Sequence, residues 1–402
     1  MTDAPDRLDI DNDYLKAQLS ELLSIPSPTG YTDSVVRYLC GELDANGVDY
    51  GITRRGAIRA RLTGRHKGGA RAIVSHLDTL GAQVKALKSN GRLALVPVGH
   101  WSSRFAEGAR TTIFTDKGTY TGTILPLKAS GHTFNDEVDT QPVAWENVEL
   151  RVDALATAKA DLERLGFEIG DMVAIHPQPE FLDNGFIVSR HLDNKAGVAV
   201  MLAALKAMLE AERRPPVDVF FLFTIAEEVG HGAASILLPD IASMVTVDNG
   251  TTAPGQNSSE FGVTIAMADQ TGPFDYHLTR KLVELCQRND IRYQKDIFRY
   301  YRSDSASAIE AGADVRTALA TFGVDASHGY ERIHLHALRS LAELLTCYAL
   351  SAVEIPRDKT LVSSSLSGFT EQPSEPAEQV LSPETEEVES FDGPVQWSRA
   401  RG

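Results

Sequence analysis

The stretch Val219-Phe220-Phe221-Leu222-Phe223-Thr224-Ile225 decides the fold class of this 402-residue chain. It is nearly all apolar and rich in aromatic and β-branched residues, which is typical of a strand buried on both faces. Such strands belong to parallel sheets that are covered by helices. Two adjacent carboxylates, Glu227 and Glu228, follow the stretch closely. Because ligands bind beyond the carboxyl ends of parallel strands, this pair is a candidate for chemistry.

Shorter strand-like and helical patterns alternate on either side of this stretch. Further strands are expected at residues 72–74, 244–247 and 317–322. Apolar residues at helical spacing predict helices at residues 14–23, 33–43, 194–209, 278–287 and 333–350. The alternation indicates an α/β fold, a three-layer sandwich with a largely parallel sheet between helices.

Residues 85–186 break this alternation. Arg92–Val98 and Thr119–Leu125 are short strand-like segments separated by turn signals, and several such segments predict a small β-rich domain. Because α/β features resume at Ile187, we expect this domain to be inserted into a larger one. The expected division is residues 1–84 and 187–355 for the two parts of the larger domain, and residues 85–186 for the insertion.

The C-terminal residues 356–402 have a different composition. Ser, Pro, Gln and Glu dominate from Ser363 onward, and the acidic residues have no basic partner until Arg399. Such a segment buries too little apolar surface to offset the chain entropy lost on ordering. We therefore expect a disordered acidic tail.

Charge and composition argue against several classes of protein. The formal net charge of −16 argues against a nucleic-acid binder, which needs an excess of Lys and Arg. The absence of a long apolar run argues against a transmembrane helix, and the acidic N-terminus argues against a secretory signal. The three cysteines are few and widely spaced, as in proteins of a reducing compartment. We expect a cytoplasmic protein with no membrane and no nucleic-acid partner.

Imidazoles and carboxylates follow the ends of the expected strands at five places. These residues are His76 and Asp78, Asp193, Glu227 and Glu228, Asp248, and His328. Their convergence at one edge of the sheet would give the ligands for two divalent metal ions, which together polarise an amide carbonyl and activate a water molecule. Mixed histidine and carboxylate ligands suit zinc, and cobalt or manganese less distinctively.

The spacing within two of these motifs suggests further roles. In His76-x-Asp78, the carboxylate of Asp78 is placed to accept the second ring N–H of His76 and so to fix its tautomer. The side chains of Glu227 and Glu228 diverge at a strand end, so one can bind metal while the other accepts a proton from water.

Each motif also has a structural interpretation. The pair Glu227-Glu228 could be a solvated surface pair, Asp193 a helix N-cap, and Asp248-Asn249-Gly250 a turn. Among the remaining histidines, His191 and His231 are weak candidates for substrate contact. The others have no ligand-like partner pattern and are expected to be structural or on the surface.

The order of the motifs resembles the glutamyl-aminopeptidase family of di-metal peptidases, often called tetrahedral aminopeptidases. The motifs are His76-x-Asp78, Leu192-Asp193-Asn194-Lys195-x-Gly197, Glu227-Glu228-Val229-Gly230, Val247-Asp248, Ser303-Asp304-Ser305-Ala306 and His328-x-x-Glu331. The resemblance covers roughly residues 12–353. It implies a mixed sheet between helices, interrupted by a small β-barrel-like domain that helps assembly. A homo-oligomer, such as a dodecamer, is implied as well.

The resemblance also assigns roles at the site. Asp193 would bridge the two ions, and Glu227 would be the general base. One ion would be completed by His76 and Asp248, and the other by Glu228 and His328. The implied activity is that of a metallo-aminopeptidase, which removes N-terminal residues from short peptides.

Two segments depart from the usual family pattern. The family usually carries Arg-Tyr-Ile-His-Ser where this chain has Val324–Gly329, and Gly99–Phe105 is unusual for the insertion. The insertion and Ser327–Arg332 look similar to a subgroup that accompanies synthesis of the osmoprotectant N-acetylglutaminylglutamine amide. One alternative function is therefore a di-metal deacylase or amidase acting on an N-acyl or amidated dipeptide. Another is a non-catalytic assembly protein, whose mark would be a missing ligand; the sequence lacks none.

Overall fold

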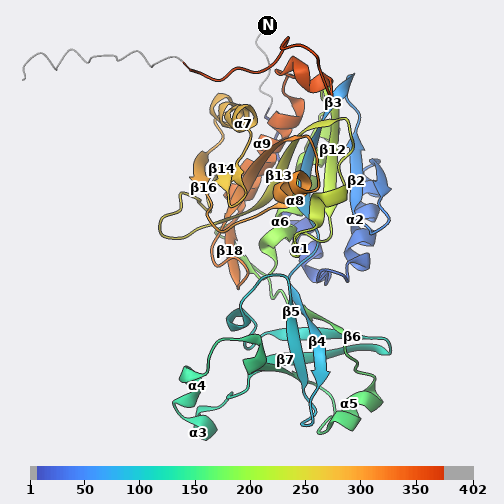
Figure 1. Cartoon of the computed structure of the whole chain (residues 1–402), viewed down its shortest axis with the longest axis vertical. Helices are drawn as coiled ribbons and strands as arrows, with labels where there is room; N and C mark the ends of the chain where they lie inside the picture. Colours follow the sequence, from blue (N-terminus) through green and yellow to red (C-terminus); the bar gives the residue numbers. More distant parts are fainter. Residues whose placement is uncertain (1–6, 375–402) are drawn as a thin grey trace, which may run out of the picture.

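A computed structural model describes residues 7–374 and has two parts, a helix-covered sheet and a smaller barrel (Figure 1). The sheet has nine strands in the order β1-β2-β12-β3-β13-β17-β14-β15, with β16 paired to β14. The strands are β1 (Asp49–Ile52), β2 (Ile58–Leu62), β3 (His66–His76), β12 (Val217–Thr224), β13 (Ile241–Thr251), β14 (Val263–Asp269), β15 (Gly272–Pro273), β16 (Tyr293–Ile297) and β17 (Arg316–Val324). The central strands β12, β3, β13 and β17 run parallel, and β1, β2, β14 and β15 join by antiparallel pairs. The prediction of an α/β fold with a largely parallel sheet is confirmed.

Strand β12 is buried on both faces, as its apolar sequence predicted. Phe221 and Phe223 pack into the core beneath the larger helical layer, whereas Phe220 and Leu222 pack on the opposite face. The larger layer consists of α1 (Asn12–Ser24), α2 (Asp33–Ala45), α6 (Leu192–Glu210), α7 (Tyr276–Arg288) and α9 (Leu335–Leu350). The short helix α8 (Asp304–Glu310) and the 3-10 helix η3 (Gly232–Ser235) lie on the other face.

The inserted part is a closed six-stranded antiparallel barrel in the order β4-β5-β8-β7-β6-β9. Its strands are β4 (Gly81–Leu87), β5 (Leu93–Val98), β6 (Arg110–Thr115), β7 (Gly118–Pro126), β8 (Val148–Val152) and β9 (Met172–Ile175). Its helices are α3 (Gly131–Phe134), α4 (Glu137–Thr140), α5 (Lys159–Leu165), and the 3-10 helices η1 (Ser103–Phe105) and η2 (Trp145–Asn147). The barrel has a hydrophobic core of its own, and it confirms the expected β-barrel-like insertion.

A small third sheet pairs two strands that follow the barrel in the chain with one strand that precedes the last long helix. It consists of β10 (Glu180–Phe181), β11 (Phe186–Ser189) and β18 (Glu331–His334), all antiparallel. The stretch 186–188, which precedes Asp193 in the chain, therefore belongs to this small sheet and not to the main one. The last long helix starts at Leu335 rather than at Ile333, because Ile333 pairs with Ile187 in this small sheet.

The described chain continues beyond the last long helix. The 3-10 helix η4 (Pro356–Lys359) packs against the main part, where Asp358 accepts a hydrogen bond of 2.9 Å from Nε of Arg316. Residues 375–402, which make up most of the expected disordered tail, lie outside the described residues. No helix between residues 7 and 374 is long and apolar enough to cross a membrane.

Candidate active site

The carboxyl ends of three adjacent strands bring most of the predicted site together. His76 ends β3, and it lies opposite Thr224, the last residue of β12. Glu227 and Glu228 follow β12 after a short turn, and Asp248 lies near the end of β13. Because the strands are parallel and in register, these side chains meet at one edge of the sheet, as predicted.

Asp193 reaches this edge from the first turn of α6 and not from a strand of the main sheet. Asp193 and Asn194 depart from helical backbone geometry at that point. Asn194 anchors the turn to β13, because its side-chain amide donates a hydrogen bond of 2.8 Å to the carbonyl of Val247. The N-cap interpretation of Asp193 is not what the structure has, since the N-cap position is occupied by His191.

The two carboxylate oxygens of Asp193 face two different histidines. Oδ1 lies 3.2 Å from Nε2 of His76, and Oδ2 lies 3.2 Å from Nε2 of His328. Two clusters able to hold a metal ion result, one formed by His76, Asp193 and Asp248, the other by Asp193, Glu228 and His328. We call them the His76 cluster and the His328 cluster. A single carboxylate shared in this way is what a pair of bridged metal ions requires.

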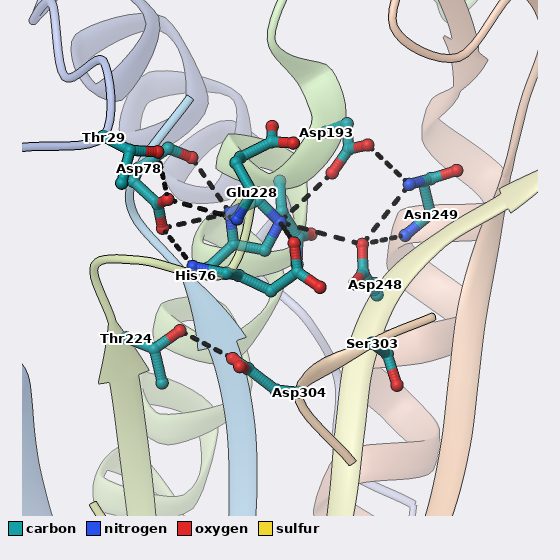
Figure 2. A network of polar contacts seen from close by, with 12 residues as sticks. Thr29, His76, Asp78, Asp193, Thr224, Glu228, Asp248, Asn249, Ser303 and Asp304 are labelled. Atoms are coloured by element: carbon teal, nitrogen blue, oxygen red, sulfur yellow. Dashed lines mark hydrogen bonds and ion pairs between the residues drawn. The ribbon is translucent and has the colours of Figure 1, made fainter. Parts of the chain in front are cut away.

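Asp78 supports the site differently from the expectation. The backbone carbonyl of Asp78, not its carboxylate, is the acceptor for Nδ1 of His76 at 2.9 Å, while the carboxylate lies 3.5 Å away. The carboxylate instead accepts a hydrogen bond of 2.6 Å from the hydroxyl of Thr29 (Figure 2). It also accepts hydrogen bonds from the backbone N–H groups of Glu227 and Glu228. Asp78 therefore fixes the turn that carries the two glutamates.

Glu227 lies beside the His76 cluster without belonging to either cluster. Its Oε2 is 3.8 Å from Nε2 of His76, and its side chain is 15 % exposed, compared with 4 % for Glu228. Glu227 thus keeps access to the cavity, while Glu228 turns toward His328, whose Nε2 lies 3.7 Å from its Oε2. The two glutamates diverge as predicted.

Three supporting residues were not singled out from the sequence. Asn249 donates a hydrogen bond of 2.6 Å to Oδ2 of Asp193 and lies next to Asp248 (Figure 2). The two oxygens of Glu331 accept the backbone N–H groups of Asp193 and His328, at 3.1 and 2.9 Å. Asn249 and Glu331 both belong to motifs given above, Asp248-Asn249-Gly250 and His328-x-x-Glu331. Their closeness in the chain to Asp248 and His328 could have indicated a role at the site.

The third missed residue is His100, which belongs to the inserted barrel. Its backbone carbonyl lies 2.9 Å from Nδ1 of His328. A carbonyl oxygen carries no sequence signature, so no motif could have indicated this contact.

His191 and His231, the weak candidates for substrate contact, have other surroundings: His191 lines a small cavity behind Asp193 and His328. His191 is the N-cap of α6, and its Nε2 lies 3.0 Å from the carbonyl of Ile175, to which it donates. Burial lowers the pKa of His191 to about 4, so the ring is neutral. His231 is exposed at the start of η3, and neither residue lines the large pocket.

Burial and mutual repulsion dominate the electrostatics of the site. Burial, together with neighbouring carboxylates, raises the pKa of Glu227 and Glu228 well above the usual value. Burial and the charge of Asp193 raise the pKa of Asp248 to about 7. Although burial alone would lower it, the hydrogen bond to Asp193 raises the pKa of His328 to about 10. Carboxylates buried this close together repel one another, and bound cations would stabilise their ionised forms.

The donor set fits two metal ions. Each cluster combines imidazole nitrogen with carboxylate oxygen, as zinc sites do. The Oε1 atom of Glu228 is buried and has no hydrogen-bond partner in the described part of the chain. A buried carboxylate oxygen without a partner is costly, and a bound cation would satisfy it.

A pocket of about 1050 Å³ opens onto the clusters. Asp193, Glu227, Glu228, Asp248 and His328 line one wall. The loop 298–303 lines another wall, and Gly99 and His100 of the barrel also border the pocket. The pocket is large enough to admit a short peptide to the clusters.

Comparison with known proteins places this site in a family. Residues 56–344 match the model of the M42 glutamyl aminopeptidases. The putative aminopeptidase YhfE of Bacillus subtilis is 38 % identical over 334 residues, which cover 83 % of this chain and 96 % of that protein.

Solved structures of similar fold extend the comparison. The Pyrococcus horikoshii TET1 peptidase, described as assembling into a tetrahedron or a large octahedral shell, has a TM-score of 0.74 at 22 % identity, and the match covers 84 % of this chain and 100 % of that one. The dodecamer of PhTET1-12s has a TM-score of 0.73 at 20 % identity, covering 84 % and 99 %.

Proposed function

This chain belongs to the M42 glutamyl aminopeptidase family and is a metallo-aminopeptidase, and we propose that it hydrolyses the N-terminal amide bond of short peptides with Glu227 as general base. The main observation in support of this proposal is the carboxylate of Asp193, whose two oxygens each lie 3.2 Å from the Nε2 atom of a different histidine. Two divalent ions held by the His76 and His328 clusters would polarise the scissile carbonyl and lower the pKa of a water molecule.

In this mechanism Glu227 and Asp78 have different roles. Glu227, accessible from the pocket and outside both clusters, takes the proton of the attacking water and passes it to the leaving amine. The buried surroundings that raise the pKa of Glu227 are of the kind that enzymes use to tune a general base. Asp78 acts as a positioning residue through its bonds to the backbone of Glu227 and Glu228.

We propose zinc as the native metal, with cobalt or manganese as alternatives that the same ligands could bind. Two histidines and three carboxylates form the donor set, and this mixture is typical of zinc. Elemental analysis of protein purified without added metal tests the assignment, and two equivalents of manganese or cobalt would contradict it.

We also propose a homo-oligomeric, cytoplasmic enzyme. The resemblance in fold to a dodecameric TET peptidase supports assembly. The three cysteines, all within the described residues, are buried and form no disulfide, as expected in a reducing compartment. Cell fractionation tests the location.

The comparison of Glu227→Gln with Glu228→Gln tests the proposed mechanism. The first variant should keep both metal ions and lose about 10²- to 10⁴-fold in kcat, because only the proton acceptor is removed. The second should lose one equivalent of metal. The measurements are metal content and turnover of aminoacyl-p-nitroanilides and short peptides, and full activity of Glu227→Gln would contradict the mechanism.

A second candidate function is a deacylase or amidase for an N-acyl or amidated dipeptide, as in the osmoprotectant subgroup. The observation in its favour is that Gly99 and His100, from the unusual insertion segment, border the pocket. Mass spectrometry of the products decides between the two functions. Release of acetate or ammonia, with no free amino acid, would favour the second over the first.

A further inference from the structure

His76 and His328 differ in which part of the chain supplies the acceptor for their Nδ1 atom. Nδ1 of His76 contacts the carbonyl of Asp78, two residues further along the same turn. Nδ1 of His328 contacts the carbonyl of His100, which belongs to the barrel and lies 228 positions away in the chain. A carbonyl can only accept, so in each case Nδ1 carries the proton and Nε2 is left to bind metal.

The loop that carries His100 is held from within the barrel. Nε1 of Trp101 donates a hydrogen bond of 3.0 Å to the carbonyl of Gly81, at the start of β4. Nε1 of Trp145 donates one of 3.2 Å to the carbonyl of Trp101. The two indole rings also pack edge to face, with centroids 4.9 Å apart. We call these two residues the Trp pair.

The same loop is packed tightly against the residues around the His328 cluster. Gly99 has a φ of +85°, and a Cβ there would approach Leu80 to 2.5 Å and the Cβ of Glu228 to 3.5 Å. A Cβ on Gly329, the neighbour of His328, would approach the ring of Phe105 to 3.2 Å. The loop 99–105 thus has little room to shift without moving its contact to His328.

We propose that the barrel loop 99–105, held by the Trp pair, positions His328 and so sets the metal affinity of the His328 cluster. Within residues 7–374, the His76 cluster takes no comparable contact from the barrel, so its affinity is set within the main part of the chain. The proposal rests on the proposed function for the existence of two bound ions. It makes Trp101 and Trp145 positioning residues, since neither binds the metal.

The test measures the two metal affinities separately. Metal-free wild-type protein, Trp101→Phe and Trp145→Phe are titrated with Zn²⁺ in competition with a chelating indicator. The binding step that disappears in His328→Ala identifies the His328 cluster. Loss of a partner that orients a metal-bound histidine costs about 10- to 100-fold in affinity. We expect this loss in the His328 step and less than a twofold change in the other step.

A matched control removes a similar hydrogen bond elsewhere in the barrel. Tyr120→Phe deletes the bond from the phenol to the carbonyl of Leu165, 2.9 Å long, and should leave both steps unchanged. If Trp101→Phe does not fold, Trp145→Phe decides alone, because it removes the bond to the carbonyl of Trp101 and leaves the bond from Trp101 to Gly81 intact.

The outcomes separate the two proposals. Unchanged affinities in the Trp variants, or equal losses in both steps, would overturn the positioning role while leaving the di-metal enzyme intact. A wild-type protein that binds no second ion would overturn both proposals.

Discussion

Glu331 illustrates how one side chain outside the ligand set orders both clusters. Its two oxygens accept the backbone N–H groups of Asp193 and His328, so one carboxylate fixes the backbone at two residues of the candidate metal clusters. Glu331 is almost fully buried, at 1 % exposure, and cannot exchange these bonds for water.

Replacing Glu331 by Gln should therefore weaken metal binding in both clusters by about 10- to 100-fold. The amide offers one acceptor and one donor, and its NH₂ group would face a backbone N–H. Equilibrium titration of the metal-free variant with Zn²⁺ measures the effect. Glu284→Gln, an exposed change on α7, is the control, and wild-type affinity in Glu331→Gln would refute the role.

At the scale of elements, the barrel depends on an ion-pair network between neighbouring strands. Glu149 of β8 is buried, and its carboxylate binds Lys88 and Arg92 in the connection between β4 and β5. Although burial would raise it, the hydrogen bonds from Lys88 and Arg92 hold the pKa of Glu149 below its usual value. The network joins β8 to the hairpin that leads into the loop 99–105.

This lowered pKa gives a pH dependence of defined sign. The carboxylate contributes stability above its unfolded pKa of about 4.5, and the contribution is lost as the pH falls through the lower folded value. Glu149→Gln should thus cost about 2 kcal/mol in the free energy of unfolding at pH 7, as hydrogen bonds to a charged group typically do, and progressively less below pH 4.5. Urea titrations across pH 3–7 measure this difference. Exposed Glu146→Gln is the control, and a pH-independent cost would contradict the ion-pair explanation.

At the scale of the whole molecule, the helix-covered sheet and the barrel both contribute residues to the candidate active site. The main part supplies the ligands of both clusters, and the barrel supplies the carbonyl for His328 and part of the pocket wall. Figure 1 shows the barrel below the sheet, with several segments of the chain running between the two parts. A barrel joined in this way contributes directly to the candidate site.

If the chain assembles like the TET peptidase of similar fold, its mass in solution should be close to twelve times 43.7 kDa. Light scattering coupled to size exclusion measures that mass directly. Dilution over a hundredfold range checks that the assembly is stable. A particle of 43.7 kDa at all concentrations would refute the homo-oligomer.

The sequence by itself determined the fold class, the presence of an insertion and the residue types of the site. An apolar β12 predicts a buried parallel strand, and imidazoles or carboxylates at strand ends predict metal ligands, because both signals are local in the chain. Only the tertiary structure decided that the two oxygens of Asp193 face different histidines and that backbone carbonyls of Asp78 and His100 hold those histidines. Every residue carries a carbonyl, so its partner depends on packing between distant segments and leaves no mark in the sequence.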